Sequence, residues 1–99
     1  MKVGLRPAAE RDIADAVAWY DEQQPGLGDE FLARLDAVLE RIVERPGGFP
    51  ATHSTFKRAL LGRFPYTIYF RAETEQIVVF AVYHQRRNPR LLATRLQRD

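Results

Sequence analysis

The sequence predicts an α+β fold in which an N-terminal strand and an antiparallel helical hairpin pack on a twisted antiparallel sheet, with a short C-terminal helix. Two observations lead to this prediction. Apolar residues recur at helical spacing over residues 7–44, and the pattern then changes to strand-like alternation over residues 56–83. Helices followed by strands indicate separate layers that bury their apolar faces against each other. A length of 99 residues allows one compact domain, residues 1–99.

The first elements expected are a short strand and a helix. Val3 and Leu5 alternate with polar or small neighbours, which is typical of a strand. Pro7 follows where the first turn of a helix tolerates proline, and it opens a helix over about residues 7–23. The apolar stripe of this helix is formed by Ala9, Ile13, Ala16, Val17 and Tyr20, and the opposite side by Asp12, Asp15, Asp21 and Glu22.

A second helix completes the hairpin. The segment 24–28 contains Pro25 and two glycines, which destabilise the interior of a helix and are expected to end it. The next helix is expected to begin at Asp29, with Gly26 and Gly28 as alternative boundaries, and to end before Arg45. The connection is short, so the helices should pack antiparallel. Its apolar stripe is Phe31, Leu35, Val38, Leu39 and Ile42. The periodicity leaves open whether Trp19 is packed or partly exposed.

Three strands and a terminal helix are expected next. Residues 56–62 alternate, Tyr66–Arg71 is rich in aromatic and β-branched residues, and Ile77–Tyr83 is an unbroken apolar run. The last run predicts a central strand that is covered on at least one face. Short connections favour an antiparallel meander, with a turn at residues 73–75. The leucines in the tail from Pro89 to Asp99 favour a short helix.

Composition excludes several classes of function. The chain has no cysteine, so it has neither disulfides nor thiolate chemistry. Its longest apolar run is too short to span a bilayer, and its first residues do not resemble a signal peptide, so we expect a cytoplasmic protein with no membrane partner. The two histidines, His53 and His84, do not form a metal-ligand pattern. No glycine-rich phosphate loop follows a strand, and Ser54 lacks a nucleophile motif. We therefore expect neither a metal nor a cofactor.

Charge is distributed unevenly along the chain. Residues 1–50 carry six Lys or Arg and ten Asp or Glu, a net charge of −4, whereas residues 51–99 carry nine and three, a net charge of +6. This asymmetry suggests a basic surface that could meet an acidic partner or a phosphate backbone. The alternative is an arginine-rich composition with ordinary solvated faces.

The segment Tyr83–Pro89, at the exit of the predicted central strand, is the candidate site. Arg86 and Arg87 provide planar guanidinium groups suited to carboxylate or phosphate, and His84 can act as an acid or base near neutral pH. The structural alternative is that the arginines pair with helix carboxylates and that His84 caps a turn.

Three upstream basic residues are further candidates. Strand alternation places Lys57 and Arg63 on one face and Arg58 on the other, unless a bulge intervenes near Gly62. Which of the three shares a surface with Arg86 is left open by the sequence.

Two blocks resemble the RelE/ParE toxin superfamily of bacterial toxin–antitoxin pairs. The first is Lys57–Phe70, with Phe-Pro-Tyr at residues 64–66, and the second is Ala81–Pro89, with a His-x-x-Arg-x-Pro pattern. The helical region is similar to the two family helices at Ala8, Asp12, Ile13, Ala16, Trp19 and Tyr20, and at Gly28, Phe31 and Leu35. The resemblance implies the same fold and a cognate antitoxin whose tail wraps the toxin. It also implies that the toxin meets DNA only indirectly, through the antitoxin.

Within this superfamily the resemblance allows two activities. RelE- and YoeB-like members cut mRNA on the ribosome, whereas ParE-like members poison DNA gyrase without assigned active-site chemistry. Here Gln85 follows the histidine, no tyrosine follows Tyr83, and Tyr66 stands where the YoeB-like branch has an arginine. A convincing acid–base pair is therefore missing, and the ParE-like, non-enzymatic activity is favoured.

Each activity assigns its own residues. Ribose-assisted cleavage needs a base, an acid and cationic groups, and in a nuclease His84, Arg58, Arg63 and Arg87 could supply parts of that set. A gyrase poison would contact its target through Arg86, Arg87 and Lys57. A third hypothesis is a family member that is retained with its partner but has no toxicity.

Overall fold

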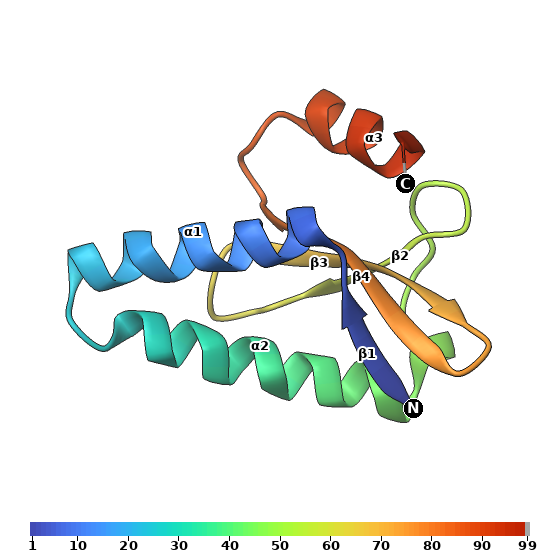
Figure 1. Ribbon diagram of the computed structural model, residues 1–99, viewed down its shortest axis with the longest axis horizontal. Coiled ribbons are helices and arrows are strands. Elements are labelled where there is room, and N and C mark those ends of the chain that lie inside the picture. The colour runs from blue at the N-terminus through green and yellow to red at the C-terminus, as the bar shows by residue number, and fades with distance from the viewer. Residues whose placement is uncertain (99) are drawn as a thin grey trace.

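The computed structural model describes residues 1–98, and Figure 1 shows how their elements are arranged. In chain order the elements are β1 (Lys2–Leu5), α1 (Pro7–Gln23), α2 (Leu27–Glu44), the 3-10 turn η1 (Pro46–Gly48), β2 (Lys57–Leu60), β3 (Tyr66–Glu73), β4 (Gln76–His84) and α3 (Pro89–Arg98). The predicted order of strand, two helices, three strands and short helix is confirmed. Asp99, the last residue of the predicted tail helix, lies outside the described residues. No helix within residues 1–98 is long and apolar enough to cross a membrane.

The hairpin of α1 and α2 turns at a glycine. Helix α2 begins at Leu27, two residues before the predicted Asp29, because Gly26 caps it with a φ of 90°. This left-handed conformation favours glycine, which has no Cβ to clash with the backbone. The Gly28 N–H then donates a hydrogen bond of 2.8 Å to Asp21 of α1 and ties the two helix ends together.

The sheet is mixed, with the strand order β1-β4-β3-β2. Strands β2, β3 and β4 form the predicted antiparallel meander, and β4 is central. Strand β1 pairs with β4 in parallel. Parallel neighbours need a long crossover connection, and the helices and strands between β1 and β4 provide it. Strand β2 ends at Leu60, shortly before Gly62 adopts a φ of 83°.

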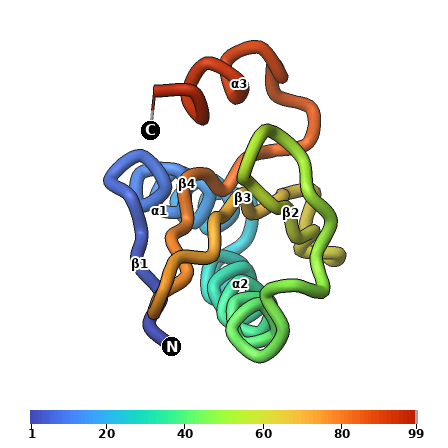
Figure 2. The backbone as a smooth tube through the Cα atoms, turned by 90° about the vertical axis from the view of Figure 1, so that its right-hand side faces the viewer, coloured from blue at the N-terminus to red at the C-terminus, as the bar shows by residue number. Residues whose placement is uncertain are grey.

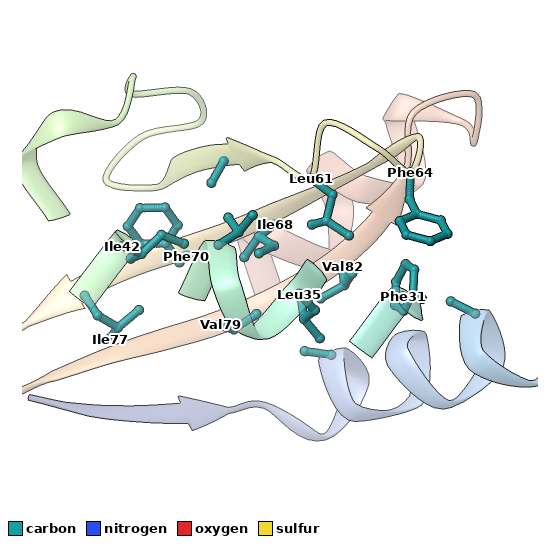
Figure 3. Packing of buried hydrophobic residues seen from close by; sticks show 14 of the residues in the cluster. Phe31, Leu35, Ile42, Leu61, Phe64, Ile68, Phe70, Ile77, Val79 and Val82 are labelled. Atoms are coloured by element: carbon teal, nitrogen blue, oxygen red, sulfur yellow. The ribbon is translucent and has the colours of Figure 1, made fainter. Parts of the chain in front are cut away.

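The main core lies between the helical hairpin and the sheet (Figure 3). We call it the hairpin cluster. Figure 3 shows Phe31, Leu35 and Ile42 of α2 pointing toward β3 and β4. The strands contribute Ile68, Phe70, Ile77, Val79 and Val82. Alternate residues of β3 face this core, as a pleated strand requires.

The other face of the sheet is covered by α3 and by the loop before β2 (Figure 2). Leu92 and Leu96 of α3 are buried there against aromatic side chains of the sheet and of the loop before β2. We call this core the α3 cluster, and its further members are Phe56, Val78, Phe80, Ala81 and Tyr83. A ten-residue helix covers less of the sheet than the hairpin does, so this face stays partly open.

Candidate functional site

A β-bulge in β4 sets the direction of the side chains at the exit of the strand. Tyr69 of β3 pairs with Ala81, but the next residue, Phe70, pairs with Val79. Phe80 is therefore an extra residue on β4, and both it and Ala81 join the α3 cluster. Such a bulge inverts the alternation of every residue that follows it in the strand.

The inverted alternation brings His84 to the side of the helical hairpin. Val82 belongs to the hairpin cluster, whereas Tyr83 belongs to the α3 cluster. His84 pairs with Tyr66 in register, and their rings lie edge to face with centroids 5.1 Å apart. If all residues from Val79 onward alternated regularly, with no bulge, His84 would face α3 instead.

Asp12 of α1 lies against the edge of β4 that β1 leaves uncovered. Its side chain is only 8% exposed. Its carboxylate accepts a 3.0 Å hydrogen bond from the backbone N–H of Val82 and two hydrogen bonds from Arg95 of α3, at 2.5 and 3.1 Å. The guanidinium of Arg87 lies 4.0 Å from the same carboxylate. Asp12 thus joins α1, β4 and α3, and its charge is compensated within the protein.

His84 and Arg87 are linked by the turn after β4. The Nδ1 atom of His84 accepts a 3.0 Å hydrogen bond from the Arg86 N–H, and the His84 carbonyl accepts another of 3.0 Å from the Arg87 N–H. In neutral His84 the proton is consequently on Nε2. The Arg87 guanidinium stacks 4.6 Å from the ring of Tyr83. These contacts match the structural alternative for His84 and Arg87.

A hollow of about 240 Å³ opens beside His84, between α1 and the exit of β4. Trp19 forms one wall and is 54% exposed, which answers the question that the periodicity left open. The full lining is Asp12, Asp15, Ala16, Trp19, Tyr66, Val82, His84 and Arg87. A half-exposed tryptophan beside a guanidinium is suited to a partner that has both an apolar and an anionic part.

Tyr66, at the back of this hollow, is a poor candidate for a general base. Burial raises the pKa of its phenol above the ordinary value; Tyr20, Asp12 and Asp15 raise it further, and Arg87 opposes them. The phenol therefore keeps its proton at neutral pH. It can donate a hydrogen bond or form an apolar wall, but it does not accept a proton from a substrate.

The other predicted site residues lie elsewhere. Lys57 donates a 3.2 Å hydrogen bond to the carbonyl of Phe49, and Arg63 forms an ion pair of 2.5 Å with Glu30 of α2, so both lie on the hairpin side. Arg58 lies on the α3 side, because its partner in register, Tyr69, packs there. Of the four residues assigned to a nuclease, the hollow is lined by His84 and Arg87 but by neither Arg58 nor Arg63.

Sequence reasoning missed the part that Asp12 plays. Helical periodicity assigned it to the side opposite the apolar stripe, but α1 packs with this side chain turned toward β4 and α3. The available signal was its place among the residues that resemble the first family helix. Its partner, Arg95, could not be found from spacing, because 83 residues separate the two.

The chemistry that these residues offer is anion recognition. Arg87 is half exposed, and Arg86 is exposed beside it. Among residues 1–98 no three His, Asp or Glu side chains gather as a metal site would require. The site therefore presents guanidinium groups and aromatic rings on a rigid strand end, an arrangement suited to binding carboxylates or phosphates.

A helical hairpin on a mixed four-stranded sheet, with arginines and a histidine at the exit of the central strand, defines the class of protein: a toxin of the RelE/ParE superfamily. A family model described as "ParE toxin of type II toxin-antitoxin system, parDE" matches residues 3–89. The match spans most of the chain, so the chain belongs to the ParE toxin family and is the toxin component of a type II toxin–antitoxin system.

Individual relatives agree with this assignment. Toxin ParE2 of Mycobacterium tuberculosis, from two strains, is 27% identical over 89 residues, which cover 89% of this chain and 85% of the relative. Among solved structures, the "Chromosomal ParDE TA system from P. aeruginosa" contains a chain that is similar with a TM-score of 0.63 and 16% identity. This similarity covers 85% of our chain and 95% of the other, and it concerns the fold alone.

Proposed function

We propose that this ParE toxin inhibits DNA gyrase in the cytoplasm, and that its cognate antitoxin neutralises it. The toxin acts by binding, through Arg86, Arg87 and Lys57, and it meets DNA only through the antitoxin. The observation that carries the proposal is the arginine-rich exit of β4: residues 84–98 include five arginines and neither Asp nor Glu. Such a surface is attracted to an acidic protein face or a DNA-bound enzyme.

The arrangement of the basic residues supports binding more than catalysis. A ribonuclease needs a base, an acid and cations around one phosphate. Among residues 1–98, His84 and Arg87 share a hollow, but Arg58 lies on the other face of the sheet and Arg63 is paired with Glu30. One imidazole nitrogen of His84 is also occupied by the turn.

The first test is gyrase supercoiling of relaxed plasmid by purified enzyme, with and without the toxin. We expect loss of supercoiling or accumulation of cleaved DNA, and reversal by the antitoxin. The double variant Arg86→Ala/Arg87→Ala should need about tenfold more protein for the same inhibition, since each lost charge-assisted contact weakens binding. The matched control is Arg41→Ala, an exposed arginine of α2, which should inhibit like the native protein.

One observation favours a second candidate function, a ribosome-dependent mRNA endoribonuclease: His84 and Arg87 line the same hollow with Trp19. The variant His84→Ala separates the two functions, because it should abolish growth arrest only if His84 is catalytic and should have a modest effect on gyrase inhibition. A toxin that arrests growth with unchanged gyrase activity, and loses this effect with His84→Ala, would replace the first function with the second.

A further inference from the structure

Two arginines converge on the carboxylate of Asp12, and they contact it unequally. Arg95 of α3 donates to both carboxylate oxygens, at 2.5 and 3.1 Å, and its side chain is only 20% exposed. Arg87 approaches the same carboxylate only to 4.0 Å, which is beyond the roughly 3.2 Å of a good hydrogen bond, and half of its side chain is exposed. Arg95 is therefore the principal partner of Asp12, and Arg87 lies beside this pair at the surface.

The ring of Tyr83 holds both guanidinium groups close to Asp12. Arg87 lies 4.6 Å and Arg95 lies 5.4 Å from the ring centroid. The Tyr83 hydroxyl donates a 3.1 Å hydrogen bond to the carbonyl of Asn88, which ties the ring to the turn that carries Arg87. An approach of about 1 Å would convert the 4.0 Å contact between Arg87 and Asp12 into a hydrogen bond. The two arginines thus compete for one carboxylate.

The burial of Asp12 makes this competition matter. A carboxylate that is only 8% exposed is costly unless a cation and hydrogen bonds compensate its charge. The Val82 N–H supplies one hydrogen bond, and Arg95 supplies the compensating charge. If Arg95 lost its charge, the carboxylate would draw the neighbouring guanidinium of Arg87 inward, away from the surface.

We infer that Arg95 is a positioning residue: by occupying Asp12 it keeps the guanidinium of Arg87 at the surface, where a target can bind it. That Arg87 binds a target rests on the proposed function, but its capture by Asp12 does not. Arg95 acts here without touching the target. Loss of its charge should therefore weaken target binding, and removal of the Asp12 charge as well should restore it.

The reactivity of Arg87 with phenylglyoxal, a reagent for accessible guanidinium groups, tests the capture without any target. Cleavage after Glu75 by a glutamate-specific protease releases residues 76–99, which contain no further glutamate. Tandem mass spectrometry of this peptide distinguishes modified Arg87 from modified Arg86, which serves as the internal reference. In Arg95→Met, which keeps a long side chain but removes the charge, Arg87 should react at least about threefold more slowly.

A second-site variant separates positioning from a purely structural role. In Asp12→Asn/Arg95→Met no carboxylate is left to capture Arg87, so its reactivity should return to within about twofold of the native rate. Structural damage would instead be equal or greater in the double variant. Arg95→Lys keeps a charge beside Asp12 and should retain most of the reactivity. The matched control is Arg90→Met, an exposed arginine of α3, which should change the rate by less than about twofold. Circular dichroism shows whether each variant is folded.

Gyrase supercoiling then connects the capture to target binding. Arg95→Met should need at least about threefold more toxin for the same inhibition, and Asp12→Asn/Arg95→Met should return to within about twofold of the native toxin. An unchanged reactivity of Arg87 in Arg95→Met, or no recovery in the double variant, would overturn the inference. So would gyrase inhibition that does not follow the reactivity. If the native toxin leaves gyrase active, the proposed function fails, and the reactivity of Arg87 still decides whether Arg95 keeps it at the surface.

Discussion

The two faces of the sheet are covered by different means. The hairpin cluster is formed by apolar side chains from two long helices, and Phe31 and Phe70 are fully buried in it. The α3 cluster lies under one short helix and the loop before β2, and most of the arginine–ring stacks among residues 1–98 lie on it. These stacks join Arg71 to Phe56 and Phe80, Arg6 to Phe80, and Arg87 and Arg95 to Tyr83. On the hairpin side, Arg41 stacks on Phe49 and Arg63 on Phe64.

This difference suggests a division of labour between the faces. Apolar packing over a large area stabilises the fold, while arginines on aromatic rings can stay near solvent and still be held in place. The arginines that a partner could contact are consequently held in place on the α3 side of the sheet, which has the thinner covering layer. If this is right, changes in the hairpin cluster should mainly lower stability, and changes around α3 should mainly alter binding.

The largest loss of stability is expected from Phe31→Ala in the hairpin cluster. Removal of a fully buried phenylalanine creates a cavity and costs about 3–5 kcal/mol. Urea unfolding followed by circular dichroism measures it. The counterpart is Leu96→Ala in the α3 cluster, which should cost about 2 kcal/mol because the neighbouring open surface can relax into the space. Equal losses would contradict the division of labour.

A smaller loss, of about 1–3 kcal/mol, is expected from Asp12→Asn. The amide oxygen can still accept the Val82 N–H, but the ion pair between Asp12 and Arg95, whose side chain is only 20% exposed, is lost. The control is Asp15→Asn, an exposed carboxylate one turn further along α1, which should change the unfolding free energy by less than about 0.5 kcal/mol. Similar effects of the two variants would mean that Asp12 does not join α1 to α3.

Arg71→Ala should cost about 0.5–1 kcal/mol, because it removes the guanidinium that lies 4.9 Å from the Phe80 ring and 5.4 Å from the Phe56 ring. Arg71 also pairs with Glu73 at 2.9 Å. Glu73→Gln removes only this pair, so the difference between the two variants in urea unfolding measures the stacking. A Glu73→Gln variant as unstable as Arg71→Ala would assign the whole effect to the ion pair.

The smallest effect concerns Tyr66→Phe at alkaline pH. The pKa of Tyr66 is raised in the folded state, mainly by burial, so the unfolded chain loses this proton first as pH rises. The stability that the protonated phenol provides is fully present below the unfolded pKa, near 10. It is lost as pH rises from there through the folded pKa. Unfolding at pH 7 and above pH 10 should show a smaller alkaline loss for Tyr66→Phe than for the native protein.

The sequence predicted the elements better than the sheet. The boundaries of α1 follow from Pro7 and the segment around Pro25, and the unbroken run from Ile77 to Tyr83 indicated a central strand. These signals are local. The parallel pairing of β1 with β4 joins residues more than 70 positions apart, and a four-residue strand carries no information about its neighbour.

The site was harder to predict for the same reason. His84 and Arg87 were found because they follow the central strand, but their direction depends on the bulge at Phe80, where the apolar run shows no break. The role of Asp12 depends on an arginine in α3 and on a backbone amide in β4. Whether Arg58, Arg63, Arg86 and Lys57 act on a target stays a prediction.

The extra Phe80 in β4 corresponds to a single codon. Because Phe80 is accommodated as an extra residue, the pairing resumes beyond it, and His84 still pairs with Tyr66. A relative that lacked this residue would keep its histidine and the next arginine on the sides seen here, provided that the alignment carries a one-residue gap at the bulge. Counting alternate residues along the strand as if it were regular would instead place these residues on the wrong surface of the toxin.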